Sequence, residues 1–150
     1  MKEIKVDVVE LKPMRMLSFY GYGEQPEDIA WEKAASWLKE NKEKITPEKT
    51  RIFGFNNPCP SAGSTKYGYE FLVSVNEDIF SSGDLRVTVL PGGLYATAKC
   101  EIEKGEEFPM YWNSLNAWCE QSSYSFGTHQ WLEEHTIEGR PFAMFLPLKE

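Results

Sequence analysis

The segment Tyr67–Val75, YGYEFLVSV, places one carboxylate inside an otherwise apolar run. Aromatic and β-branched residues alternate there, which predicts a β-strand with Glu70 and Gly68 on the face opposite to Tyr69. A carboxylate in such a setting costs free energy unless it is solvated, paired or used, so Glu70 is predicted to face a cleft. Gly68 leaves space beside it for a group to approach the backbone. The alternative is a carboxylate satisfied by a neighbouring Arg, Lys or Tyr, with no ligand.

A second acidic residue stands in a comparable setting in the segment Gln130–His135. A strand over this segment places Trp131, Glu133 and His135 on one face. That face would carry a ring for stacking, a carboxylate, and an imidazole that titrates near neutral pH. Glu133 is therefore the second candidate for a ligand-binding carboxylate. The alternative is an exposed strand residue beside Glu134.

Aromatic residues are abundant, with five Trp, seven Tyr and nine Phe in 150 residues. Because ligand pockets are mostly apolar and aromatic, we expect Trp37 and Trp112 to reach a pocket wall from two predicted helices. Tyr95 and Tyr111 could each present a hydroxyl to that pocket. Trp131 is the best stacking candidate outside the helices. The alternatives are core packing for the indoles and hydrogen bonds to backbone for the tyrosines.

Metal and cofactor chemistry has no recognisable motif in the chain. The three Cys and two His lack the C-x-x-C or H-x-x-x-H spacing of a zinc site. Cys59 lies between two prolines without a nearby base, which indicates an inert loop thiol. The segment 91–93, Pro-Gly-Gly, predicts a hairpin turn, since a phosphate-binding loop would end in Lys-Ser/Thr and open a helix. We therefore predict neither a metal nor a cofactor.

Length and charge narrow the class of protein. A chain of 150 residues is enough for one domain with a core, and its net charge of −7 argues against direct binding of nucleic acid or of anionic membranes. The same charge favours a cationic or neutral ligand. The N-terminus lacks the apolar core of a signal peptide, and an odd number of cysteines suggests reduced thiols. These features predict a cytoplasmic protein, either a monomer or a homodimer, that binds no membrane.

Periodicity assigns the remaining elements. Alternating residues predict strands at 3–11, 14–20, 51–55, 67–75, 85–90, 94–101, 130–137 and 142–148. Helical spacing predicts helices over Pro26–Lys44 and Glu106–Gln121. Their apolar stripes are Ala30, Ala34, Trp37 and Leu38 in the first helix, and Phe108, Tyr111, Trp112, Leu115, Trp118 and Cys119 in the second.

The order of these elements repeats. Each half runs strand, turn, strand, helix and then two strands, and each predicted helix carries two Trp six residues apart. We therefore predict one α+β domain over residues 1–150, built by pseudo-twofold duplication of halves at about 1–80 and 81–150. Its antiparallel sheet would carry two helices on one face and a ligand groove. Each half would offer one carboxylate to this groove, Glu70 and Glu133.

The ordered motifs of the chain resemble those of the GyrI-like small-molecule-binding domain, the effector-binding domain of AraC-type and multidrug-sensing regulators. The matching residues, in order along nearly the whole chain, are Asn57-Pro58, Tyr69-Glu70, Leu90-Pro91-Gly92-Gly93-Leu94-Tyr95-Ala96, Tyr111, Leu115, Trp118 and Leu132-Glu133. The resemblance implies tandem strand–helix–strand–strand modules with an aromatic pocket and a buried acid on its floor. It also implies that Glu133 matches the acid that contacts cationic aromatic drugs in the sensing members.

Two departures from the family pattern affect these expectations. The tyrosine usually found two residues after that acid is His135 here, and an imidazole can itself become cationic. The chain also has no segment or basic surface for the DNA-binding domain of the regulators, so it is similar to a stand-alone member.

Three functions remain open at this stage. The first is binding of lipophilic, cationic aromatic molecules, for sequestration or reporting of a drug or toxin, by stacking and charge pairing. The second, which the resemblance permits, is hydrolysis of strained-ring, cyclopropane-type genotoxins. Glu70 or Glu133 would then act as general base, and a Tyr hydroxyl such as that of Tyr111 would assist. The third is a protein-binding module, which predicts an exposed apolar patch.

Overall fold

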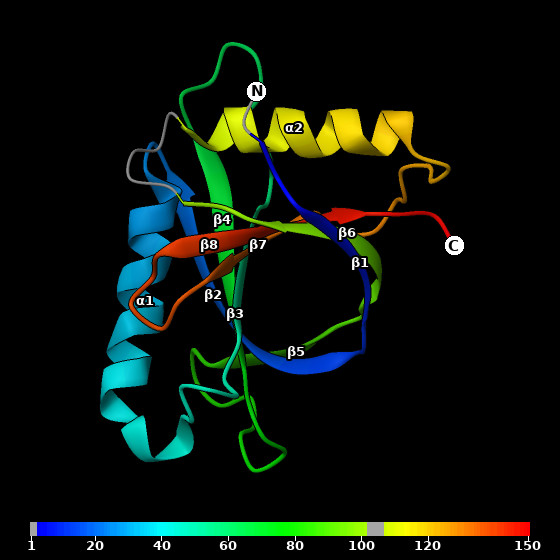
Figure 1. Ribbon diagram of the computed structural model, residues 1–150. Helices are drawn as coiled ribbons and strands as arrows, with labels where there is room; N and C mark the ends of the chain where they lie inside the picture. Colours follow the sequence, from blue (N-terminus) through cyan, green and yellow to red (C-terminus); the bar gives the residue numbers. More distant parts are fainter. Residues whose placement is uncertain (1–2, 102–106) are drawn as a thin grey trace. The chain divides into compact units, whose positions relative to one another are not determined.

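The computed structural model describes residues 3–101 and 107–150 (Figure 1). Within these ranges the order β–β–α–β–β occurs twice, as the sequence repeat predicts. The first set is β1 (Val6–Leu11), β2 (Met14–Gly23), α1 (Pro26–Glu40), the short 3-10 helix η1 (Lys42–Lys44), β3 (Ile52–Asn56) and β4 (Tyr67–Ser74). The second set is β5 (Arg86–Leu90), β6 (Gly93–Lys99), α2 (Phe108–Gln121), β7 (Leu132–His135) and β8 (Pro141–Pro147).

The chain packs as two compact units, each with one helix on its own set of strands. The α1 unit consists of residues 14–90 and 135–140. The α2 unit consists of the described residues of segments 1–13, 91–134 and 141–150. This arrangement confirms the predicted fold class, α+β with antiparallel strands and two helices.

In the α1 unit the strand order is β3-β4-β2-β5, and each strand is antiparallel to its neighbour. The apolar stripe of α1 covers one face of these strands, as its spacing predicts. Its members Ala30, Ala34, Trp37 and Leu38 form one buried cluster with Phe19, Tyr69, Phe71 and Val73. The face of β4 that carries Tyr69 is therefore the helix-covered face, and Glu70 lies on the other one.

In the α2 unit the strand order is β1-β6-β8-β7. β6 is antiparallel to both β1 and β8. The helix contributes Tyr111, Leu115 and Cys119 to a buried cluster. Alternate residues of the strands complete it, namely Ala96, Ala98, Met144 and Leu146. The period-two alternation of β6 and β8 thus buries one face under α2.

In each half of the sequence, the first strand belongs to the unit that contains the helix of the other half. β1 pairs with β6 from Val6↔Ala98 to Leu11↔Gly93. β5 pairs with β2 from Arg86↔Ser18 to Leu90↔Met14. The repeated halves of the sequence are therefore not the packing units, since each half contributes one strand to the unit that contains the other helix.

Local hydrogen bonds explain where elements end earlier than predicted. The α1 helix ends at Glu40 because Asn41 leaves the helical backbone angles, with φ −125° and ψ 38°, while its side-chain Nδ2 donates to the carbonyl of Trp37. β7 stops at His135 because the N–H of Thr136 bonds to Arg140 and starts a turn. The predicted start of the second helix at Glu106 lies outside the described residues. Neither of the two described helices is long and apolar enough to cross a bilayer.

Candidate ligand-binding site

The candidate site lies on the face of the α1 unit that α1 does not cover. Glu70 stands there at the middle of β4, only 5% exposed. Strand pairing places Ser18 opposite Leu72, and Leu72 opposite Phe53, on the same face. Leu72 and Phe53 are buried, so the carboxylate of Glu70 borders an apolar part of this face.

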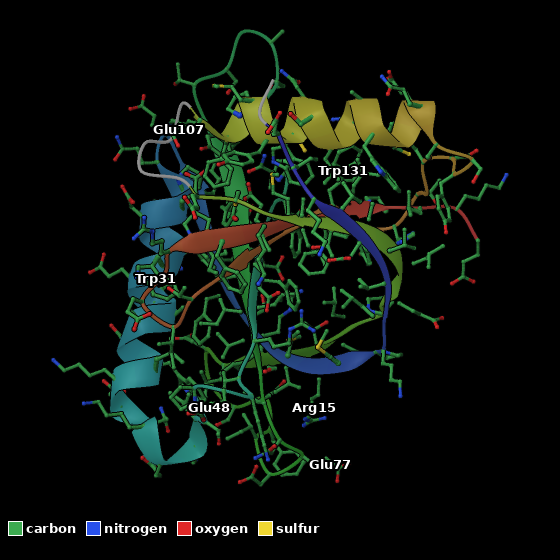
Figure 2. The ribbon with its side chains drawn as sticks, viewed as in Figure 1. Arg15, Trp31, Glu48, Glu77, Glu107 and Trp131 are labelled. Carbon is green, nitrogen blue, oxygen red and sulfur yellow. The ribbon has the colours of Figure 1, made fainter. Side chains whose placement is uncertain are left out.

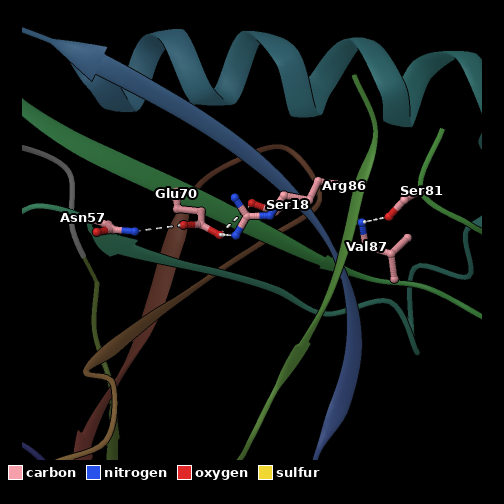
Figure 3. A network of polar contacts seen from close by, with 6 residues as sticks. All are labelled: Ser18, Asn57, Glu70, Ser81, Arg86 and Val87. Atoms are coloured by element: carbon pink, nitrogen blue, oxygen red, sulfur yellow. Dashed lines mark hydrogen bonds and ion pairs between the residues drawn. The ribbon is translucent and has the colours of Figure 1, made fainter. Parts of the chain in front are cut away.

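Glu70 has three polar neighbours (Figure 3). The hydroxyl of Ser18 donates a hydrogen bond of 2.6 Å to Oε2. The side-chain amide of Asn57 donates one of 3.2 Å to Oε1. The Arg86 guanidinium lies 4.0 Å from Oε2, and its side chain is 69% exposed while that of Glu70 is 6% exposed. Both carboxylate oxygens are therefore fixed by neutral donors, and the one cation seen beside them is held loosely at the solvent edge.

Two aromatic residues stand beside Glu70 on the neighbouring strands. Its Cα partners are Tyr20 on β2 and Phe55 on β3, so the three side chains share one face. Tyr20 is 38% exposed, and Phe55 is half-buried. A carboxylate between two accessible rings can pair with a positive charge while the rings contact flat apolar groups.

Gly68 is surrounded by the protein's own polar atoms. A Cβ atom built at this position would collide with the backbone carbonyl of Asn57 and with the hydroxyl of Tyr20. The same strand edge is closed by hydrogen bonds from Asn57 N–H to Gly68 and from Gly68 N–H to Pro58. The close approach predicted for this glycine is therefore present, and it positions both Asn57 and Tyr20 next to Glu70.

On β7 the two acidic residues lie on opposite faces. His135 packs on Tyr69 and Phe71 of the α1 core, and Glu133 shares its side of the strand by alternation. Glu134 lies on the other side and is 7% exposed. Glu134 is therefore the more buried carboxylate of β7, whereas Glu133 is half-buried. Because Glu133 and Glu134 are adjacent in a strand of four residues, the sequence pattern does not indicate which of the two side chains is buried.

His135 belongs to the core of the α1 unit. Its Nε2 lies 3.2 Å from the Tyr69 hydroxyl, and its ring meets that of Phe71 edge-on at 4.8 Å. Burial lowers the pKa of the imidazole from 6.5 to about 4. His135 is therefore neutral at pH 7 and does not add a positive charge to the core of the α1 unit.

The two predicted tyrosines are bonded to the backbone. The Tyr95 hydroxyl donates to the carbonyl of Gln130 at 2.6 Å, and burial raises the pKa of Tyr95 to about 12. The Tyr111 hydroxyl donates to the carbonyl of Glu101 at 3.1 Å and accepts from its N–H at 3.2 Å. Both side chains thus follow the alternative expectation of a buried tyrosine that satisfies main-chain groups.

The predicted tryptophans separate into three environments. Trp37 is 8% exposed in the α1 core, where it also borders a cavity of about 560 Å³ with Phe19 and Leu85. In the α2 unit, Trp112 lies 5.3 Å from Trp131. The ring of Trp131 in turn stacks on that of Phe126, with 6.2 Å between the ring centroids, and Trp131 is 37% exposed. Trp131 is labelled in Figure 2. Trp131 therefore retains an accessible ring, as a stacking residue requires.

Only part of the predicted set meets at one place. Glu70 is central, but its neighbours are residues that the periodicity did not single out: Ser18, Tyr20, Phe55, Asn57 and Arg86. The register between β2, β3 and β4 would have identified Tyr20 and Phe55, since each is the direct cross-strand partner of Glu70.

Comparison with known proteins agrees with this architecture. The family model of the Cass2 integron-associated effector binding protein matches residues 7–147. A search of curated proteins found no match to the chain.

Solved structures share the fold at low sequence identity. A chain of the EcmrR–DNA complex has a TM-score of 0.72 and 14% identity; the alignment covers 98% of this chain and 58% of that one. SAV2435 bound to tetraphenylphosphonium has a TM-score of 0.58 and 13% identity, with 97% and 94% covered. A hydrolase from Listeria innocua has a TM-score of 0.66 and 10% identity, with 97% and 92% covered.

The family match spans both units, and the structural similarities confirm the fold that the ordered motifs predict. The chain belongs to the integron-associated effector-binding proteins, with the fold of a GyrI-like effector-binding domain that binds small molecules.

Proposed function

We propose that the protein binds lipophilic, aromatic cations at Glu70. The observation that carries this proposal is a carboxylate, 5% exposed, whose cross-strand partners on both sides are aromatic. The buried carboxylate attracts positive charge in a dry surrounding, and the rings of Tyr20 and Phe55 offer flat apolar contact. SAV2435, which shares the fold, is seen with tetraphenylphosphonium, a ligand of this chemical type.

Arg86 is the group that a cationic ligand would displace. Its guanidinium lies 4.0 Å from Glu70 on a side chain that is 69% exposed, so solvent screens the pair and moving the arginine aside costs little. Ser18 and Asn57 would continue to hold the carboxylate in place. On the α2 unit, considered by itself, the exposed ring of Trp131 beside Trp112 and the carboxylate of Glu133 remain predicted ligand contacts. The role would be to sequester or report a drug or toxin in the cytoplasm.

Calorimetric titration with tetraphenylphosphonium tests this function. Wild type should bind, and Glu70→Gln should weaken binding at least about tenfold, since loss of one buried charge partner is worth roughly 1.4 kcal/mol or more. Tyr20→Ala should weaken it less, because only a ring contact is removed. Glu77→Gln is the matched control, because Glu77 is an exposed carboxylate of the same unit. Equal affinity of wild type and Glu70→Gln would exclude the proposed site.

Hydrolysis of a strained-ring electrophile is the second candidate function. It is favoured by the fold shared with the Listeria innocua hydrolase and by the Ser18 hydroxyl bonded to a buried carboxylate that has Tyr20 as its cross-strand neighbour. Glu70 would activate water, and Tyr20 would take the assisting role predicted for Tyr111. Loss of a cyclopropane-bearing alkylating agent over time in wild type, but not in Glu70→Gln, would establish turnover. Binding without any loss of the agent would exclude it.

A further inference from the structure

A second cavity of about 500 Å³ lies on the α1 unit, away from the Glu70 residues. Its walls come from α1, from η1 and the segment after it, and from the turn that joins β7 to β8. The apolar lining residues are Trp31, Ala35, Leu38, Ile45, Pro47 and Ile137. This volume is within the range of small-molecule sites, and the lining shares no residue with the Glu70 site.

The wall formed by Trp31 is held in place from two sides. Its ring meets Phe71 edge-on at 5.2 Å. On the other side it lies against Gly139, where an added Cβ would come within 2.5 Å of the indole. Gly139 has a φ of +88°, and its turn is closed by hydrogen bonds between Thr136 and Arg140 and from Gly139 to Thr136. The Trp31 wall of the cavity is therefore packed against both the α1 core and the turn between β7 and β8.

The rim of this cavity is positively charged. Lys39 at the end of α1 and Lys42 in η1 border it, and Glu138 in the turn is its one acidic lining residue. All three side chains are exposed, so the ammonium groups can reach a ligand at the mouth. The rim has a net positive charge, although the net charge of the chain is −7. A positive rim favours an anionic ligand, whereas the Glu70 site is proposed to favour a cation.

We propose that this cavity binds an amphipathic carboxylate, such as a medium-chain fatty acid. The hydrocarbon would lie between Trp31, Leu38 and Ile137, and the carboxylate would lie at the rim between Lys39 and Lys42. Apolar burial supplies the affinity, and the two lysines supply the preference for an anion over a cation of the same length. The protein would thus carry two sites of opposite charge preference on one unit.

Three ligands of equal chain length test this assignment by calorimetry: dodecanoate, dodecanol and dodecyltrimethylammonium. Dodecanoate should bind at least about tenfold more tightly than dodecyltrimethylammonium, with dodecanol between them. Tetraphenylphosphonium should not displace dodecanoate, and Glu70→Gln should leave dodecanoate binding unchanged. The experiment would therefore distinguish a failure of the binding proposal at Glu70 from a failure of the binding proposal for this cavity. Tighter binding of the cation, or no binding of dodecanoate, would overturn the proposal.

Variants then locate the ligand. Ala35→Trp should fill the cavity and abolish dodecanoate binding, with folding checked by circular dichroism. Lys39→Gln/Lys42→Gln keeps the cavity and should weaken dodecanoate about tenfold while dodecanol binding stays unchanged. Lys44→Gln/Lys49→Gln is the matched control, since both lysines are exposed nearby but do not line the cavity. Equal weakening in both double variants would overturn the assignment. Self-association in sedimentation velocity that Ala35→Trp abolishes would also overturn it, because the occupant would then be a second copy.

Discussion

Ser18 donates a hydrogen bond of 2.6 Å to Oε2 of Glu70, although its direct cross-strand partner is Leu72. The bond therefore runs diagonally across the β2–β4 pair, from one position to the next on the same face. Together with Asn57 it orients the carboxylate without neutralising it.

Removal of this bond should destabilise the fold. Ser18→Ala leaves Oε2 of a buried carboxylate without its neutral donor, which should lower the free energy of unfolding by about 2 kcal/mol. Urea denaturation measures this change. Ser36→Ala, at an exposed position of α1, should change it by less than about 0.5 kcal/mol. Equal effects of the two changes would mean that water replaces the serine hydroxyl at Glu70.

Gly68 should tolerate no side chain. Gly68→Ala forces the new Cβ against a backbone carbonyl and the Tyr20 hydroxyl, and such overpacking should cost about 3 kcal/mol and weaken ligand binding at Glu70. Gly63→Ala is a useful comparison because a Cβ there meets no atom within 4 Å. Its positive φ of +80° should cost only about 1 kcal/mol. Thermal denaturation of both variants should therefore rank Gly68→Ala as the less stable.

The buried imidazole of His135 should make stability depend on pH. Its pKa is about 4 in the folded protein, against 6.5 for an ordinary histidine. As pH falls below 6.5 the unfolded chain binds the proton first, so stability is full above that pH and decreases towards pH 4. The loss should amount to about 3 kcal/mol.

His135→Phe should remove this part of the pH profile between pH 4 and pH 6.5, as measured by urea denaturation at several pH values. His129→Gln is the control, since it alters the other histidine of the chain and leaves His135 in place. An unchanged slope in His135→Phe would contradict the assignment.

The three thiols should differ in reactivity. Cys59 is exposed, whereas Cys100 and Cys119 are buried in the α2 unit. Burial, and to a lesser extent the charge of Glu133, raises the pKa of Cys100 to about 11, so little thiolate forms at pH 8. A thiol-reactive dye should therefore modify one cysteine rapidly in the native protein, and Cys59→Ser should abolish that fast phase. Two fast thiols would show that one core cysteine is accessible.

Strand and helix patterns predicted the fold well because most segments have one apolar face. The alternation in Tyr67–Val75 placed Tyr69 under α1 and Glu70 on the other side, as the structure has them. Boundaries were less predictable. Asn41 ends α1 through hydrogen bonds to Trp37, and a helical wheel contains no information on such competition.

The candidate site was only partly predictable for a different reason. A single sequence shows which residues share a strand face, but not which strands are neighbours or in what register. Tyr20 lies 50 residues and Phe55 lies 15 residues before Glu70 in the sequence, and only strand pairing brings them to the Glu70 site. The predicted duplication matched Glu133 to Glu70 by the order of elements, whereas Glu70 lies on the second strand after its helix and Glu133 on the first.

The exchange of first strands between the two halves has a consequence for the origin of the fold. A peptide that contained only one half would present β2 without β5, or β6 without β1, and would leave a sheet edge open. Two copies of such a peptide could close both edges by swapping their N-terminal strands, as a symmetric homodimer. The strand order within each unit is the one that a covalently joined form of such a dimer would have. By strand register Glu70 corresponds to Ala143 in the other half, so the two halves differ at the candidate carboxylate.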